Sequence, residues 1–283
     1  MSGRRIELSA RDGLRLAATE WPGAADRTPL LCLSGICRTA LDYAAIGARH
    51  GGTRRVVALD YAGHGESARA ADPRRYAPEK LIADVIDAMA ALGLHRVAVV
   101  GTSFGGLVAF ALGVMRPASL AAVVLNDIGP EIERDGREAV VELVGTDPCC
   151  ATLEDATAWL RRRHPPMELL DEEGWRALAW RTYAEGEDRL WHPRWDIRVG
   201  QQAVGPDAGP PPDLWPYFGA LAKLPLMLVW GQQSHLLSVD TVALMRKARP
   251  DMRLVTLPGT GHAPTLEEPA AVAGLDRFLA ALP

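Results

Sequence analysis

The sequence predicts an α/β fold in which a mostly parallel sheet of eight strands carries helices on both faces. The chain opens with two alternating segments joined by Asp12-Gly13, the signal of a β-hairpin. Short apolar runs then alternate with helical segments, an order that favours parallel strands joined by crossover helices. The alternation stops near residue 130 and resumes near residue 222, which indicates an insertion. The 283 residues, 48% of them hydrophobic, suffice for one large α/β domain with such an insertion.

Strands are expected where the sequence alternates with a period of two or stays apolar for several residues. They cover residues 4–9, 14–21, 29–33, 55–59, 97–100, 120–125, 226–230 and 253–257. Helices are expected at residues 40–50, 78–92, 239–248 and 268–282, with a further helix that ends near residue 115 before Pro117.

Residues 131–221 lose the strand–helix alternation and hold six of the eight tryptophans. They also contain Gly209-Pro210-Pro211-Pro212, which indicates a flexible connection. We therefore expect a mostly helical cap over residues 131–221. The core domain is expected to comprise residues 1–130 and 222–283.

The strongest chemical signal is Gly101-Thr102-Ser103-Phe104-Gly105, between a Val-rich strand and a helix of small residues. A strand that turns directly into a helix forces its central residue into a strained backbone conformation, and flanking glycines remove Cβ atoms that would clash. The Ser103 hydroxyl is then presented beside the amides and the positive dipole end of the helix. A dinucleotide-binding turn is disfavoured, because the glycine spacing is not G-x-G-x-x-G.

Composition argues against several classes of protein. The net charge of −4 gives no basis for binding nucleic acid or an anionic membrane. Four cysteines (Cys32, Cys37, Cys149 and Cys150) are too few for a disulfide scaffold, and C-x-x-C and H-E-x-x-H motifs are absent, so we expect neither a metal nor a cofactor. The chain has no secretory leader pattern and no apolar run near the ~18 residues of a membrane span, which favours a cytoplasmic location.

These features resemble the α/β-hydrolase-fold serine hydrolases that carry a helical cap after the sixth strand. The resemblance covers essentially the whole chain. It implies action on esters, lactones, amides or carbon–carbon bonds next to a ketone, with nucleophile, acid and histidine in that chain order. Besides the serine motif, it rests on Asp60-Tyr61-Ala62-Gly63-His64-Gly65-Glu66-Ser67, Asn126-Asp127-Ile128-Gly129-Pro130 and Gly261-His262.

By this resemblance Ser103 is the nucleophile and His262, in a loop after the last strand, is its base. The oxyanion hole would use the backbone N–H groups of Phe104 and Ile36. Ile36 follows Ser34-Gly35, where the family usually shows His-Gly. The family uses the His64 segment as a structural turn, so no catalytic role is expected there.

The acid is where the chain departs from the family pattern. The family usually places it after strand seven, in a stretch resembling Gly-x-x-Ser-Asp, but this chain has His235 at the final position. Asp127, after strand six, is the favoured candidate, because haloalkane dehalogenases and some other relatives place their acid there. Asp240, His235 itself and a Ser–His pair without a carboxylate remain open, as does a turn-capping role for Asp127.

The predicted function is cofactor-free hydrolysis of a carboxylic ester or lactone through an acyl-enzyme. The substrate is expected to be an apolar or cyclic ester, with Arg38, Trp195, Trp215 and His235 as candidate binding residues. The alternatives are a carbon–carbon bond hydrolase of the same fold and a non-catalytic ligand-binding member. A dehalogenase or epoxide hydrolase is disfavoured, because those enzymes need a carboxylate where Ser103 stands. The sequence predicts no oligomeric state.

Overall fold

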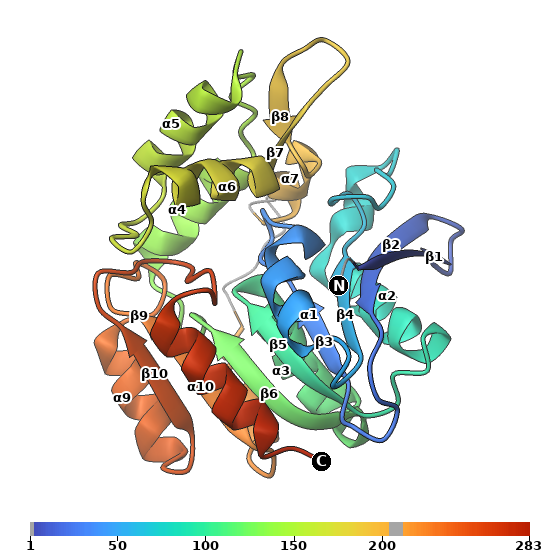
Figure 1. Cartoon of the computed structure of the whole chain (residues 1–283), viewed down its shortest axis with the longest axis vertical. Coiled ribbons are helices and arrows are strands. Elements are labelled where there is room, and N and C mark those ends of the chain that lie inside the picture. Colours follow the sequence, from blue (N-terminus) through green and yellow to red (C-terminus); the bar gives the residue numbers. More distant parts are fainter. Residues whose placement is uncertain (1–2, 204–211) are drawn as a thin grey trace.

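The computed structural model describes residues 3–203 and 212–283 and contains an eight-stranded sheet (Figure 1). The strands are β1 (Arg4–Ser9), β2 (Arg15–Trp21), β3 (Leu30–Leu33), β4 (Val56–Asp60), β5 (Val97–Thr102), β6 (Leu120–Asn126), β9 (Leu226–Gly231) and β10 (Arg253–Leu257). Their order across the sheet is β1-β2-β4-β3-β5-β6-β9-β10. β2 pairs antiparallel with β1 and β4, and the other pairs are parallel. The predicted fold class is confirmed, with the opening hairpin at the edge of the sheet.

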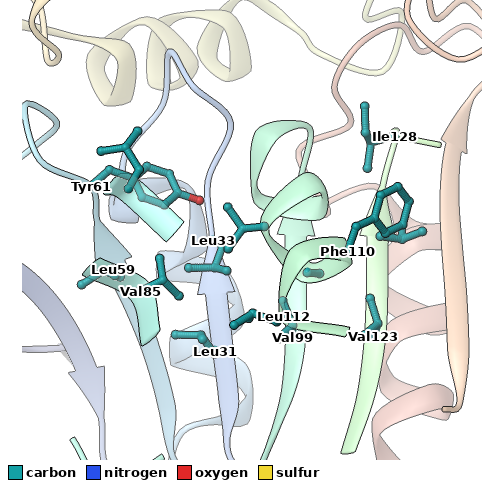
Figure 2. Close-up of a cluster of buried hydrophobic side chains, with 14 of the residues drawn as sticks. Leu31, Leu33, Leu59, Tyr61, Val85, Val99, Phe110, Leu112, Val123 and Ile128 are labelled. Atoms are coloured by element: carbon teal, nitrogen blue, oxygen red, sulfur yellow. The ribbon is translucent and has the colours of Figure 1, made fainter. Parts of the chain in front are cut away.

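Helices cover both faces of this sheet. One face carries α1 (Ala44–His50) and α10 (Pro269–Ala280), and the other carries α2 (Pro78–Ala91), α3 (Phe104–Met115), α8 (Trp215–Ala220) and α9 (Val239–Ala248). Each face of the sheet has its own hydrophobic core: the first lies under α1 and α10, and the second under α2, α3, α8 and α9. Along β3, Leu30 and Cys32 belong to the first core and Leu31 and Leu33 to the second, as the two-residue period of a strand requires. Figure 2 shows part of the second core, where Phe110 of α3 packs among side chains of the strands.

The first helical region differs from the sequence expectation. It begins with a 3₁₀ turn, Ala40–Tyr43, before α1. Asp60 at the end of β4 accepts a hydrogen bond from the Ala40 amide (2.7 Å), and the Thr39 hydroxyl accepts one from Leu41 (3.4 Å). These side-chain acceptors satisfy the amides at the start of the turn, which the sequence pattern alone did not distinguish from an α-helix.

The segment between β6 and β9 forms elements that lie above the carboxyl ends of the strands (Figure 1). They are α4 (Arg134–Val144), α5 (Leu153–Arg163), α6 (Glu172–Thr182), the hairpin β7 (Tyr183–Glu185) and β8 (Trp191–Pro193), and α7 (Gly200–Ala203). The hairpin was not expected in this segment. α8, near the end of the segment, packs instead on α3, where the Phe218 and Phe110 rings meet edge to face. Of the expected connection at 209–212, only Pro212 lies within the described residues.

Candidate active site

Ser103 occupies the sharp turn between β5 and α3, with φ 50° and ψ −114°. Such a positive φ is rare for a residue with a side chain. A Cβ at Gly101 would lie 2.5 Å from the carbonyl group of Gly105, and a Cβ at Gly105 would lie 2.0 Å from the Leu33 carbonyl oxygen. The two glycines therefore permit the turn for the steric reason that their spacing predicts.

Ser103, His262 and Asp127 form a continuous series of hydrogen bonds. His262 Nε2 lies 3.0 Å from Ser103 Oγ, and His262 Nδ1 lies 2.8 Å from Asp127 Oδ2. The other carboxylate oxygen of Asp127 accepts a hydrogen bond from the Gly231 amide (2.9 Å), and the side chain is fully buried. With Nδ1–H donated to Asp127, the Nε2 lone pair faces the serine hydroxyl, which is the orientation a general base requires.

Asp127 reaches His262 because β6 lies between β5 and β9 in the sheet. Its amide donates to the Val229 carbonyl (2.8 Å), which keeps the residue beside β9 after β6 ends. The two other acid candidates lie elsewhere. Asp240 is exposed in the first turn of α9, and His235 is an exposed residue on the wall of the cavity above Ser103. In the described part of the chain neither forms a hydrogen bond with His262.

A second buried network holds the strand ends together behind Ser103. The Asn126 amide nitrogen donates to Thr102 Oγ1 (3.1 Å) and to the Pro264 carbonyl (2.8 Å). Because Pro264 belongs to the loop that carries His262, Asn126 ties this loop to the ends of β5 and β6. No role was predicted for Asn126 from the sequence, although it stands directly before Asp127.

The loop after β3 approaches the serine closely. A Cβ at Gly35 would lie 3.5 Å from the Ser103 Cβ, and Ile36 lines the same cavity as Ser103. Within the described residues, the amides of Ile36 and Phe104 have no hydrogen-bond acceptor. Two unpaired N–H groups beside a serine hydroxyl can receive a developing oxyanion.

His64 contacts the backbone of this loop. Its Nε2 lies 2.6 Å from the Ile36 carbonyl oxygen, and the side chain is fully buried. Burial lowers the pKa of His64, so the ring is neutral at pH 7 and carries one proton. Nδ1 lies 3.0 Å from the Ala62 carbonyl oxygen, and we assign the proton to Nε2 because its contact is the shorter of the two. From the sequence, His64 was expected only to form part of a turn. The structure gives it contact with the backbone of the expected oxyanion-hole residue.

The cavity above Ser103 has a volume of about 380 Å³. Its apolar wall includes Ala139, Val140 and Leu143 of α4, whose helical spacing turns them to one side. Polar side chains also line the cavity. Among them, Arg38 forms two hydrogen bonds to Asp42 (2.6 and 2.5 Å) and one to the Thr182 hydroxyl. These α4 residues were not predicted to line the cavity, although their helical spacing is visible in the sequence.

Of the four expected substrate-binding residues, Arg38 and His235 line this cavity and the two tryptophans do not. Trp195 is 1% exposed and its indole N–H donates to the Val144 carbonyl (2.8 Å). Trp215 donates to Glu131 (2.7 Å) and its ring packs on Phe218. Among the described residues no tryptophan lines the cavity, so the expectation for Trp195 and Trp215 is corrected. Trp195 is buried and Trp215 is half-buried, and each indole N–H has an acceptor outside the cavity lining.

Two titratable groups on the cavity wall are neutral at pH 7. Burial raises the pKa of the Cys37 thiol to about 11 and lowers the pKa of His164 to about 4. Cys37 is therefore a poor nucleophile despite its position near Ser103, since the thiolate is the reactive form. The serine hydroxyl paired with His262 is the better activated nucleophile in the cavity.

A serine in a strand-to-helix turn, a histidine after the last strand and an open sheet with crossover helices together define the α/β-hydrolase fold. A model of the alpha/beta hydrolase fold family matches residues 28–269, and the chain belongs to this family of hydrolases. Its members act on small molecules. Within the described residues, no helix combines the length and apolar character needed to cross a lipid bilayer.

Individual relatives extend this likeness over nearly the whole chain. A 3-hydroxybutyrate-oligomer hydrolase of Cupriavidus necator is 31% identical over 274 residues, covering 93% of this chain and 92% of the relative. The crystal structure of an alpha/beta hydrolase from Novosphingobium aromaticivorans is 35% identical, with a TM-score of 0.94 over 99% of this chain and 98% of that one. A 2-hydroxymuconate semialdehyde hydrolase of Pseudomonas putida is 40% identical over 73 residues, 26% of each chain.

Proposed function

We propose that the protein is a serine hydrolase that cleaves carboxylic esters or lactones through an acyl-enzyme. Ser103 is the nucleophile, His262 the general base and acid, and Asp127 the group that orients and stabilises His262. The observation that carries the proposal is the hydrogen-bond series from Ser103 Oγ through the His262 ring to the buried Asp127 carboxylate. Both ring nitrogens are engaged, so the serine proton has a defined acceptor.

In the acylation step Ser103 Oγ attacks the substrate carbonyl while His262 Nε2 takes the hydroxyl proton. The carbonyl oxygen becomes an oxyanion that accepts hydrogen bonds from the Ile36 and Phe104 amides. Collapse of the tetrahedral intermediate breaks the ester C–O bond, and His262 gives its proton to the leaving alcohol. Asp127 stabilises the imidazolium that exists between these two transfers.

Deacylation repeats the sequence with water in place of the serine. His262 removes a proton from the water, the resulting hydroxide attacks the acyl carbonyl, and the ester bond to Ser103 breaks as His262 returns the proton to Oγ. No cofactor is required in either step. The cap proposed for residues 131–221 would limit access of bulk water, because α4 and α6 contribute walls of the cavity.

The substrate we favour is an aliphatic ester of a short hydroxy acid. Such a molecule presents methyl and methylene groups to the α4 wall and polar ester or carboxyl groups to the Arg38 end of the cavity. The likeness to a 3-hydroxybutyrate-oligomer hydrolase supports this choice and makes a 3-hydroxybutyrate oligomer the first substrate to test.

Hydrolysis of a carbon–carbon bond beside a ketone is the second candidate. It would use the same three residues. The likeness of one segment to a 2-hydroxymuconate semialdehyde hydrolase is the reason to test this reaction as well. A substrate panel separates the two reactions. It should contain a p-nitrophenyl ester, a 3-hydroxybutyrate trimer, a lactone and a vinylogous diketone.

We expect turnover of the esters and none by the Ser103→Ala variant, which serves as the blank. Labelling of Ser103 by a fluorophosphonate probe tests the nucleophile directly. Exclusive turnover of the diketone would favour the carbon–carbon reaction. Folded protein that neither turns over any panel member nor reacts with the probe would contradict the proposal and favour a ligand-binding role.

A further inference from the structure

A second group of reactive side chains lies on the cap, where the loop between α4 and α5 meets β8. Cys150 forms an antiparallel backbone bridge with Trp191, with N–H···O distances of 3.2 and 2.7 Å. In an antiparallel pair the next residues on the two segments also face each other, so the bridge brings Cys149 beside His192. Asp147 completes the group, since its Oδ2 lies 2.8 Å from His192 Nδ1.

We propose that Asp147, Cys149 and His192 bind a divalent transition-metal ion, with Zn²⁺ the best match to this donor set. One carboxylate oxygen, the thiol sulfur and one imidazole nitrogen lie within 4.8 Å of one another. In a tetrahedral zinc site, bonds of 2.0–2.3 Å separate the ligand atoms by about 3.3–3.6 Å. Closing on an ion therefore needs only side-chain adjustment, and a water molecule can occupy the fourth position.

The surroundings of His192 support this assignment. Its other ring nitrogen, Nε2, lies 3.0 Å from both carboxylate oxygens of Asp188. Metal-binding histidines commonly donate their second N–H to a carboxylate, which fixes the tautomer and strengthens the ligand. In the metal-free protein Nδ1 is hydrogen-bonded to Asp147 Oδ2. A bound ion would take the place of the Nδ1 proton and be held by the Nδ1 lone pair and the Asp147 carboxylate, while Nε2–H still donates to Asp188.

The site is accessible and separate from Ser103. Asp147, Asp188 and His192 line an open cavity of about 440 Å³, and Cys149 is exposed. Among the described residues, this cavity and the one above Ser103 share no lining side chain. A bound ion would join the α4–α5 loop to β8 and so stabilise the cap, without entering the hydrolytic reaction. The proposal departs from the expectation of no metal, which depended on the absence of C-x-x-C and H-E-x-x-H motifs. This site has no such motif because Cys149 and His192 are distant in the chain.

The test uses the metal-free full-length protein, titrated with Co²⁺ alone and with Zn²⁺ alone. We expect saturable binding of one ion, a thiolate-to-cobalt charge-transfer band, and a Zn²⁺-dependent rise in Tm. Cys149→Ser should abolish the band and the rise in Tm. Cys150→Ser is the matched control, because its side chain belongs to the cap core rather than to the site, and it should keep both effects.

Asp188→Asn probes the outer carboxylate and should weaken Zn²⁺ binding by about 10- to 100-fold. Circular dichroism of each metal-free variant establishes that it is folded. Absence of saturable binding to the wild type, or a cobalt band that persists in folded Cys149→Ser, would overturn the proposal. Hydrolytic activity should not change when the ion is removed, so the result does not depend on the function proposed for Ser103.

Discussion

The ends of β6 and β9 offer two places from which a side chain could reach His262, and they differ in burial and contacts. Asp127 after β6 is fully buried, and each of its carboxylate oxygens accepts a hydrogen bond. His235, in the loop after β9, is exposed at the cavity wall. The comparison indicates that a triad acid can move to another strand if the end of the neighbouring strand supplies its second hydrogen-bond partner, as Gly231 at the end of β9 does for Asp127.

The loop that carries His262 explains why β6 can supply the carboxylate. This loop crosses the end of β9, where a Cβ at Gly231 would lie 2.5 Å from the Thr260 carbonyl oxygen. It then meets β6, where Asn126 bonds to the Pro264 carbonyl. The histidine ring is thereby held above the junction of β5 and β6. Three substitutions test this account and a fourth, at His64, tests the oxyanion loop; the largest expected effect comes first.

Asp127→Asn should lower kcat by about 10⁴-fold, the scale seen when a triad acid loses its charge and the histidine takes the wrong tautomer. Steady-state kinetics on the best ester of the panel measure the effect. Asp240→Asn is the control and should leave kcat unchanged, because Asp240 is exposed on α9. A folded Asp127→Asn variant with nearly wild-type turnover would show that the acid lies elsewhere.

Gly231→Ala should lower kcat by about 10²-fold, since a catalytic group displaced by about 1 Å can cost that much. The added Cβ would push on the Thr260 carbonyl and shift the loop that holds His262. Kinetics with a thermal unfolding curve separate displacement from misfolding. Gly219→Ala is the control, because nothing lies within 4 Å of its Cβ position. Unchanged kcat in Gly231→Ala would mean that the loop does not depend on close passage over β9.

His64→Asn should lower kcat about tenfold with little change in KM, less than the ~10²-fold cost of deleting an oxyanion-hole donor. The shorter side chain cannot reach the Ile36 carbonyl, whereas His64→Gln can place an N–H there and should recover most of the loss. This effect acts through the oxyanion loop rather than through the acid. Equal activity of the two variants would remove His64 as a positioning residue.

His235→Asp should have the smallest effect and leave kcat nearly unchanged, because Asp127 already occupies the Nδ1 side of His262. The informative measurement is the double variant with Asp127→Asn. No recovery of activity is expected there, since the end of β9 lies under the crossing loop. Recovery would show that the two strand ends are interchangeable and that the burial of Asp127 is not required.

Several features of the core could be predicted from the sequence for local reasons. Apolar runs of a few residues identify strands such as β5 and β6, because a strand buried on both faces needs apolar side chains throughout. Gly101 and Gly105 predict the serine turn, because no Cβ fits beside the backbone there. The residues that line the cavity above Ser103 could not be predicted from local patterns in this way. Trp195 and Trp215 were assigned to it by residue type, but their indole partners, Val144 and Glu131, are distant in the chain.

By itself the sequence determined the strand–helix order, the position of Ser103 at a strained turn and a short set of candidates for its partners. These depend on periodicity and on contacts between near neighbours in the chain. Only the tertiary structure decided which carboxylate meets His262 and which residues line the cavity, and it alone brought Cys149 beside His192. Those arrangements depend on strand order and loop crossings, which join residues that no local pattern relates.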